Sequence, residues 1–261
     1  MRILFKVIPI LILFGFLLPP GEAAGESGHE VLLKKAYELQ IQYKETEALA
    51  VYEQIISADA ENFEALCQAS LLHSRMGERF ADDSRKMDHF NFAKTYAMRA
   101  HQLDSTDARS NYAMALSLAS LVMISGPKQR LALTNQVKTY LDNALLCDNT
   151  HADAWHLLGR WYFKMANLNF AEITAAKMLF GGVSGKISNQ DAVHAMEMAI
   201  QHNPNNLRYY YDLACIYQEM KDKPSCASTL QQALALNLEL QTKEELELSR
   251  RCKIMLQDQY K

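Results

Sequence analysis

The stretch that decides the fold is Ala154-Trp155-His156-Leu157-Leu158-Gly159-Arg160-Trp161-Tyr162. Leu158, Gly159 and Tyr162 follow Trp155 by three, four and seven positions. This is the spacing of residues that share one face of an α-helix. A large residue, a leucine, a small residue and an aromatic residue on one face predict a helix that packs closely against a second helix.

The partner of this helix is predicted about 37 positions further on. Ala192, Met196, Ala199 and Pro204 have the small, bulky, small and proline order of the second helix of a tetratricopeptide repeat. The Trp155 stretch matches the first helix of the same repeat. A standard unit has about 34 residues, so about 21 residues are inserted between these two helices.

The same frame extends along the chain and predicts five units. One position of the first helix recurs in each unit, and it is occupied in turn by Leu32, Leu66, Asn111, Trp155 and Tyr210. The spacing to the next unit exceeds the standard repeat length by about three helical turns in units two and three and by about six turns in unit four. We therefore expect longer helices there, with turns near Gly77 to Asp83, Gly126-Pro127 and Gly181 to Ser188. An unrelated helical bundle is the alternative.

The predicted architecture is all-α: a tetratricopeptide-like, right-handed solenoid of helical hairpins with lengthened central helices over residues 29–241. Thr242 and Glu245 form a capping-box pattern that predicts the start of a further helix. Residues 242–261 are accordingly expected to cap the solenoid and to cover its last hairpin.

The N-terminus has the layout of a signal peptide. Arg2 and Lys6 precede an apolar run from Val7 to Leu18, and Gly21 and Ala23 provide small residues for cleavage. We expect residues 1–23 to be removed, residues 24–28 to form a short linker, and the product to be periplasmic or secreted, without a stable membrane span. An uncleaved anchor is the alternative, although the run is shorter than the about 20 residues that span a bilayer.

Composition and motifs favour a binding protein over an enzyme. The formal net charge of -3 gives no global field for nucleic acid. No nucleophile elbow, Walker loop or dinucleotide fingerprint occurs, and the His and Asp clusters lack metal-ligand spacing, so no cofactor or metal is expected. The five cysteines contain no close pair. Cys215 and Cys226 fall on paired helices, where either a disulfide or two free thiols is consistent with the pattern.

The chain resembles the regulator of microtubule dynamics family. The resemblance covers most of residues 29 to 261 and is carried by Ala154 to Gly159, Trp161, Ala176 to Phe180 and the helix that begins at Ala192. It implies a divergent tetratricopeptide-like domain with lengthened helices. It also implies a binding role, since animal members are associated with microtubules and one with organelle contacts and lipid handling.

Candidate binding residues follow from the positions of a tetratricopeptide first helix that face the concave side. These positions select Arg109, Tyr112, His156, Arg160, Phe163, Lys164, Arg208 and Tyr211, with Tyr37 and Arg75 toward the N-terminal end. Arginine and aromatic side chains suit an acidic peptide or protein partner. A carrier of an apolar anionic small molecule such as a lipid is the alternative, and a groove filled by the protein's own side chains is the third possibility. Arg109, Arg160 and Arg208 are expected to form a cationic strip.

Overall fold

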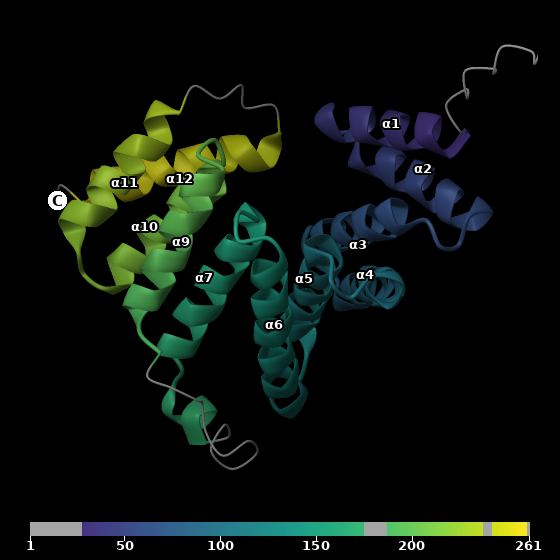
Figure 1. Ribbon diagram of the computed structural model, residues 1–261. Helices are drawn as coiled ribbons and strands as arrows, with labels where there is room; N and C mark the ends of the chain where they lie inside the picture. Colours follow the sequence, from purple (N-terminus) through teal and green to yellow (C-terminus); the bar gives the residue numbers. More distant parts are fainter. Residues whose placement is uncertain (1–27, 175–186, 237–241, 260–261) are drawn as a thin grey trace, which may run out of the picture.

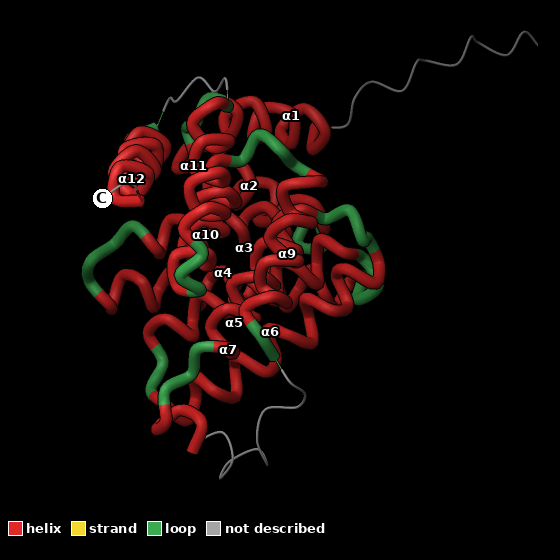
Figure 2. Tube along the Cα trace, turned by 90° about the vertical axis from the view of Figure 1, so that its left-hand side faces the viewer, coloured by secondary structure: helices red, strands yellow, loops and turns green. Residues whose placement is uncertain are grey.

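The computed structural model describes residues 28–174, 187–236 and 242–259, and within these ranges the chain is helical without strands (Figure 2). The predicted signal peptide lies outside the described residues. The first three hairpins are α1 (Gly28–Ile41) with α2 (Glu45–Ala58), α3 (Phe63–Glu78) with α4 (Asp83–Leu103), and α5 (Ala108–Ile124) with α6 (Pro127–Cys147). The remaining helices are α7 (Ala152–Ala166), α9 (Asn189–His202), α10 (Leu207–Glu219), α11 (Lys223–Ala235) and α12 (Lys243–Gln259).

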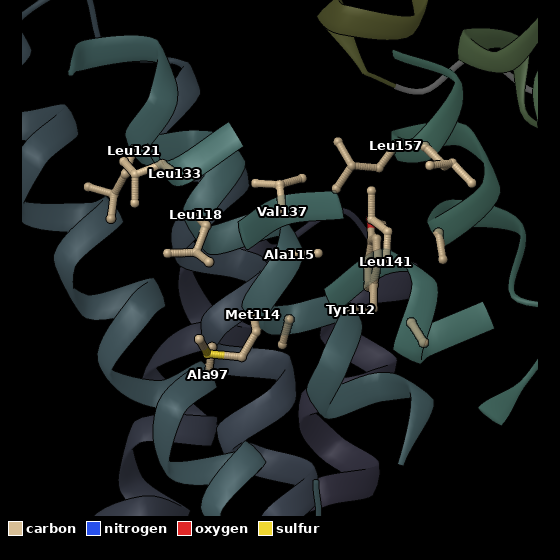
Figure 3. Packing of buried hydrophobic residues seen from close by; sticks show 14 of the residues in the cluster. Ala97, Tyr112, Met114, Ala115, Leu118, Leu121, Leu133, Val137, Leu141 and Leu157 are labelled. Atoms are coloured by element: carbon tan, nitrogen blue, oxygen red, sulfur yellow. The ribbon is translucent and has the colours of Figure 1, made fainter. Parts of the chain in front are cut away.

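Small residues allow the helices of each hairpin to approach closely. Buried alanines of the second helices recur in the same frame, and these include Ala48, Ala93, Ala97, Ala100, Ala144, Ala192, Ala199 and Ala233. The grooves beside them are filled by larger side chains. In the central hairpin these are Leu118 from α5 with Val137 and Leu141 from α6 (Figure 3). This ridge-and-groove packing confirms the repeat frame that the sequence predicts.

The first and last hairpins turn in the same way, which is independent support for the repeat. Tyr43 and Lys221 both have positive φ values, 58° and 59°. In each turn the residue that follows donates its backbone N–H to the carbonyl oxygen of the residue five positions earlier. These hydrogen bonds join Lys44 to Leu39 and Asp222 to Tyr217, both at 2.9 Å. These are the bonds of a left-handed helix C-cap, which satisfies carbonyls that the helix end leaves free.

The prediction of lengthened helices is confirmed in units two and three and is wrong in unit four. α4 and α6 each have 21 residues, whereas α2 and α11 have 14 and 13. In unit four, α7 has 15 residues and α9 has 14. α7 ends at Ala166, and residues 170–174 are helical again after a break. The expected turn at Gly181 lies outside the described residues.

The hairpins follow a curved path that brings the two ends of the domain together. In Figure 1 the chain runs from α1 and α2 through α5, α6 and α7 to α10, and α12 then begins close to α1 and runs away from it. Arg79 at the end of α3 donates to Glu244 of α12 at 2.8 Å, and the Tyr43 hydroxyl donates to Glu245 at 3.4 Å. The predicted capping box is confirmed, because Glu245 N–H donates to Thr242 Oγ1 at 3.1 Å.

Candidate functional site

The first helices of successive units bring the predicted cations to one surface, which we call the first-helix face. It contains Arg75 of α3, Arg160 of α7, and Arg208 with Asp212 of α10, and it adjoins the buried Tyr112 of α5. Arg160 and Arg208 are exposed and form no ion pair with any described side chain. Two guanidinium groups in consecutive units therefore remain available for an external anion.

Tyr112 lies within electrostatic reach of both Arg75 and Arg160. Burial raises the pKa of Tyr112 well above its ordinary value, and Asp153 and Tyr209 raise it further. The positive charges of Arg75 and Arg160 oppose this shift. Both guanidinium groups are therefore close enough to the phenol to act on it, although Arg75 also pairs with Glu45, at 3.5 Å.

Asp212 is a polar centre of the face that the sequence reasoning missed. Its carboxylate lies 2.7 Å from His156 Nε2, which must be the donor because a carboxylate only accepts. Burial opposes ionisation of Asp212, but this hydrogen bond and the charges of His156, Arg160 and Arg208 lower its pKa overall. The spacing of Arg208 and Asp212, four residues apart on one helix, is the signal that could have found it.

Arg109 does not belong to the cationic strip in the way we expected. Its guanidinium pairs with Glu64 at 2.6 Å and Asp107 at 2.8 Å, and it lies 4.9 Å from the centre of the Phe63 ring. Its charge is thus balanced by carboxylates of its own chain, and it ties α5 to α3. The exposed arginines of the face are Arg75, Arg160 and Arg208.

Three of the predicted aromatic residues pack inside the protein. Tyr112 is buried in the central core, and His156 is buried against the ring of Tyr209, 4.7 Å away between ring centres. Phe163 is half-buried against the apolar cluster of α9 and α10. Their positions on the first helices are as expected, but the following unit covers them. A single-helix pattern gives no information about that cover.

The remaining predicted residues have different surroundings. Lys164 pairs with Glu172 at 2.7 Å, so its charge is engaged within unit four. Tyr211 is half-buried and hydrogen-bonds to Cys215 and to Arg251 of the capping helix. Tyr37 is 61% exposed at the N-terminal end.

The structure tests the potential metal ligands and the thiols of the described part of the chain. No group of three or more potential ligands gathers among the described residues. Cys215 and Cys226 are free thiols, so the disulfide alternative is not what the structure contains. Burial raises the pKa of the Cys215 thiol to about 11. None of the described helices has the length and apolar composition needed to cross a membrane.

The stacked hairpins, the capping helix and the first-helix face define a tetratricopeptide-like helical-repeat protein. Solved structures support the fold: a thermophilic tetratricopeptide-repeat protein of Thermus thermophilus is similar with a TM-score of 0.65 and 14% identity, over 88% of this chain and 99% of that one. The protein PilF of Pseudomonas aeruginosa is similar with a TM-score of 0.52 and 11% identity, over 88% of this chain and 86% of that one.

The family follows from the sequence match. The model of Regulator of microtubule dynamics protein 1-3 matches residues 32–261, and the chain belongs to this family. Regulator of microtubule dynamics protein 1 of Pongo abelii is 26% identical over 66% of this chain and 50% of its own length. The Caenorhabditis elegans protein of that name is 26% identical over 55% of this chain and 63% of its own length. The chain thus spans about half to two thirds of these relatives.

Proposed function

We propose that this protein is a non-catalytic scaffold whose first-helix face is the concave surface that binds an acidic segment of a protein partner. The observation that carries the proposal is the pair of exposed guanidinium groups, Arg160 and Arg208, that lack an ion-pair partner among the described residues. Arginine donates two parallel hydrogen bonds to a carboxylate, which orients the ligand as well as binding it.

The surroundings of these arginines favour an extended acidic ligand over a single anion. Arg75 and Arg160 both act on Tyr112, and Arg208 lies with Asp212 on the next unit. The cations are therefore spread over three units. The negative charge of Asp212 between them selects for carboxylates at separate points and disfavours a continuous anionic surface.

The test is the binding of a fluorescently labelled oligoglutamate peptide to the full chain, with an oligolysine peptide of equal length as the probe of opposite charge. We expect Arg160→Ala to weaken oligoglutamate binding by about 1.5 to 3 kcal/mol if the contact is desolvated, with little change in the thermal midpoint. Arg250→Ala is the matched control, because Arg250 is exposed on α12 and pairs with Glu247 of the same helix.

Three outcomes would contradict the proposal. One is equal binding by the Arg160→Ala and parent proteins, and another is a preference for oligolysine. The third is recovery of a stoichiometric lipid by mass spectrometry from purified protein that binds neither peptide, which would favour the carrier of an apolar anionic molecule. A large loss of stability in Arg160→Ala with unchanged binding would show that Arg160 is a structural residue.

We further propose that the protein is exported after removal of residues 1–23, with periplasmic or secreted location. The support is the sequence pattern alone. The relatives are named for microtubule dynamics, and an exported chain does not meet microtubules of the cytosol. N-terminal sequencing of the protein from fractionated cells decides between an exported, cleaved chain and an intact cytosolic chain. An intact Met1 chain in the cytosol would overturn export and favour the partner that the relatives' name indicates.

A further inference from the structure

A second candidate site lies away from the first-helix face, between α6, α7 and α9. It is a groove of about 440 Å³ whose floor is formed by Trp155, Leu158 and Tyr162 of α7. Leu145 and Leu146 of α6 line one side of it. The volume is within the range of about 300 to 1,000 Å³ that ligand sites occupy.

The groove exists because unit four is incompletely covered. α6 and α9 each pack on α7 but make almost no contact with each other. Leu66, Asn111 and Tyr210, which correspond to Trp155 in other units, are 0%, 0% and 6% exposed. Trp155 is only half-buried. The position that is buried in units two, three and five is thus partly accessible in unit four.

The accessible surface of the groove is apolar. The indole N–H of Trp155 donates to the carbonyl oxygen of Asn149 at 2.8 Å. The only polar group of the ring therefore already has a hydrogen-bond partner, and a ligand can cover the rest of the ring with apolar atoms. Leu146, at the edge of the groove, is 86% exposed. An exposed leucine beside a half-buried tryptophan gains free energy when large apolar side chains of a ligand remove both from water.

One carboxylate lies on each side of the rim of the groove. Asp142 lies on α6 and Asp191 on α9. Lys138 shows how a cation is held here, since its ammonium contacts Asp142 at 2.7 Å and lies 5.6 Å from the centre of the Tyr162 ring. On the other side, hydrogen bonds from Ser188 lower the pKa of Asp191, and His194, which also lines the groove, lowers it further. Among the described residues, no Lys or Arg side chain forms an ion pair with Asp191.

We propose that this groove binds a peptide segment of another protein in which large apolar side chains alternate with Lys or Arg. The apolar side chains cover Trp155 and Leu146, and the basic side chain pairs with Asp191. This charge preference is opposite to that of the first-helix face. The two sites therefore take different segments, and the failure of one proposal leaves the other standing.

The test uses two synthetic amphipathic peptides of about three helical turns, one with leucine and lysine and one with glutamate in place of each lysine. The chain contains two tryptophans, so fluorine NMR of the protein labelled with 5-fluorotryptophan gives two resonances. The Trp161→Phe variant assigns them. We expect the lysine peptide to shift the Trp155 resonance and to bind at least about tenfold more tightly than the glutamate peptide at low salt.

Leu146→Asp is the variant that tests the location. Its side chain is exposed, so folding should be unaffected, whereas binding of the lysine peptide should fall about tenfold. Leu103→Asp is the matched control, at the corresponding end of α4 and 42% exposed. We expect it to bind like the parent. Arg160→Ala should also leave lysine-peptide binding unchanged.

Several results would overturn this proposal. They are an unshifted Trp155 resonance at millimolar peptide, equal binding of the two peptides, and an undiminished affinity of Leu146→Asp. A neutral alkyl detergent that shifts Trp155 as strongly as the lysine peptide would show an unspecific apolar surface and would equally overturn it.

Discussion

At the scale of single residues, His73 is the most deeply buried histidine of the described part of the chain. It is 4% exposed, and its Nδ1 lies 2.9 Å from Nδ1 of His89. Its Nε2 lies 3.2 Å from a carboxylate oxygen of Glu53, which also accepts from the Tyr96 hydroxyl. Phe92 stacks on the His73 ring at 5.2 Å. The two Nδ1 atoms share one proton, which one imidazole donates to the other. A second proton between these two atoms would have no acceptor.

This arrangement predicts a loss of stability in mild acid. Burial lowers the pKa of His73, Glu53 opposes this shift, and His89 adds to it, with a net lowering below the value of 6.5. The unfolded chain therefore binds more protons than the folded chain, so the stability contributed by neutral His73 is complete above about pH 6.5 and is lost as the pH falls below it.

The measurement is urea unfolding at several pH values. We expect the free energy of unfolding of the parent to fall more steeply below pH 6.5 than that of His73→Gln. His29→Gln is the control, because His29 is partly exposed, with Asp59 at 3.8 Å as its ion partner. If the parent and His73→Gln have parallel pH profiles, His73 does not titrate with folding.

At the scale of elements, glycine sets how closely the two helices of a hairpin approach. A Cβ added at Gly77 would clash with Cε1 of Phe90 on α4 and would lie 2.7 Å from Cδ1 of the same ring. A Cβ at Gly159, the small residue of the fold-deciding stretch, would lie 3.0 Å from Cε and Cγ of Met196 on α9. Phe90 is a rigid ring that is 0% exposed, whereas methionine is flexible. The two glycines are therefore not equivalent.

We predict that Gly77→Ala lowers the free energy of unfolding by about 1–2 kcal/mol, because the clash exceeds the gain in helix propensity. Gly159→Ala should cost about 0.5 kcal/mol or less, since Met196 adjusts. Chemical denaturation of both variants checks the order. Gly28→Ala is the clash-free control, because nothing lies within 4 Å of the added atom. The opposite order would mean that α3 and α4 can separate more easily than α7 and α9.

At the scale of the whole molecule, the contact between the first hairpins and α12 closes the curve. Arg79 pairs with Glu45 at 2.6 Å and with Glu244 at 2.8 Å, so one side chain joins the start of α2 to the start of α12. The side chains of Arg79 and Glu244 are 45% and 51% exposed. An exposed pair of this kind contributes little stability and is screened by salt. We therefore expect it to affect the distance between the ends more than the stability of the fold.

We predict that Arg79→Ala increases the radius of gyration measured by small-angle X-ray scattering, with an almost unchanged thermal midpoint. Raising the salt concentration from about 50 to about 500 mM should expand the parent in the same direction and leave Arg79→Ala unaffected. Arg250→Ala is the control, because Arg250 pairs within α12 with Glu247 at 2.8 Å. Identical scattering of the parent and Arg79→Ala at both salt concentrations would show that other contacts close the curve.

The sequence predicted on which helix face the residues of the candidate site lie, but not which of them are exposed and which are buried. Counting along the first helices placed Arg160 and Arg208 on one face, because helical periodicity is local. The same count selected Tyr112 and His156, which are buried. Burial of these two depends on the next unit, and Asp212, 56 residues beyond His156, is the partner that fixes the imidazole.

The sequence by itself determined the helical class, the frame of the repeats, the turn at Gly126-Pro127 and the start of α12 at Thr242. Each of these depends on residues within a few turns of one another, where periodicity, proline and capping side chains act directly. Only the tertiary structure decided that Arg109 is balanced by Glu64, that α7 stays short, and that Arg79 reaches Glu244, 165 residues away. Such contacts depend on how the stacked units curve, and small angles between neighbouring helix pairs accumulate over the whole chain.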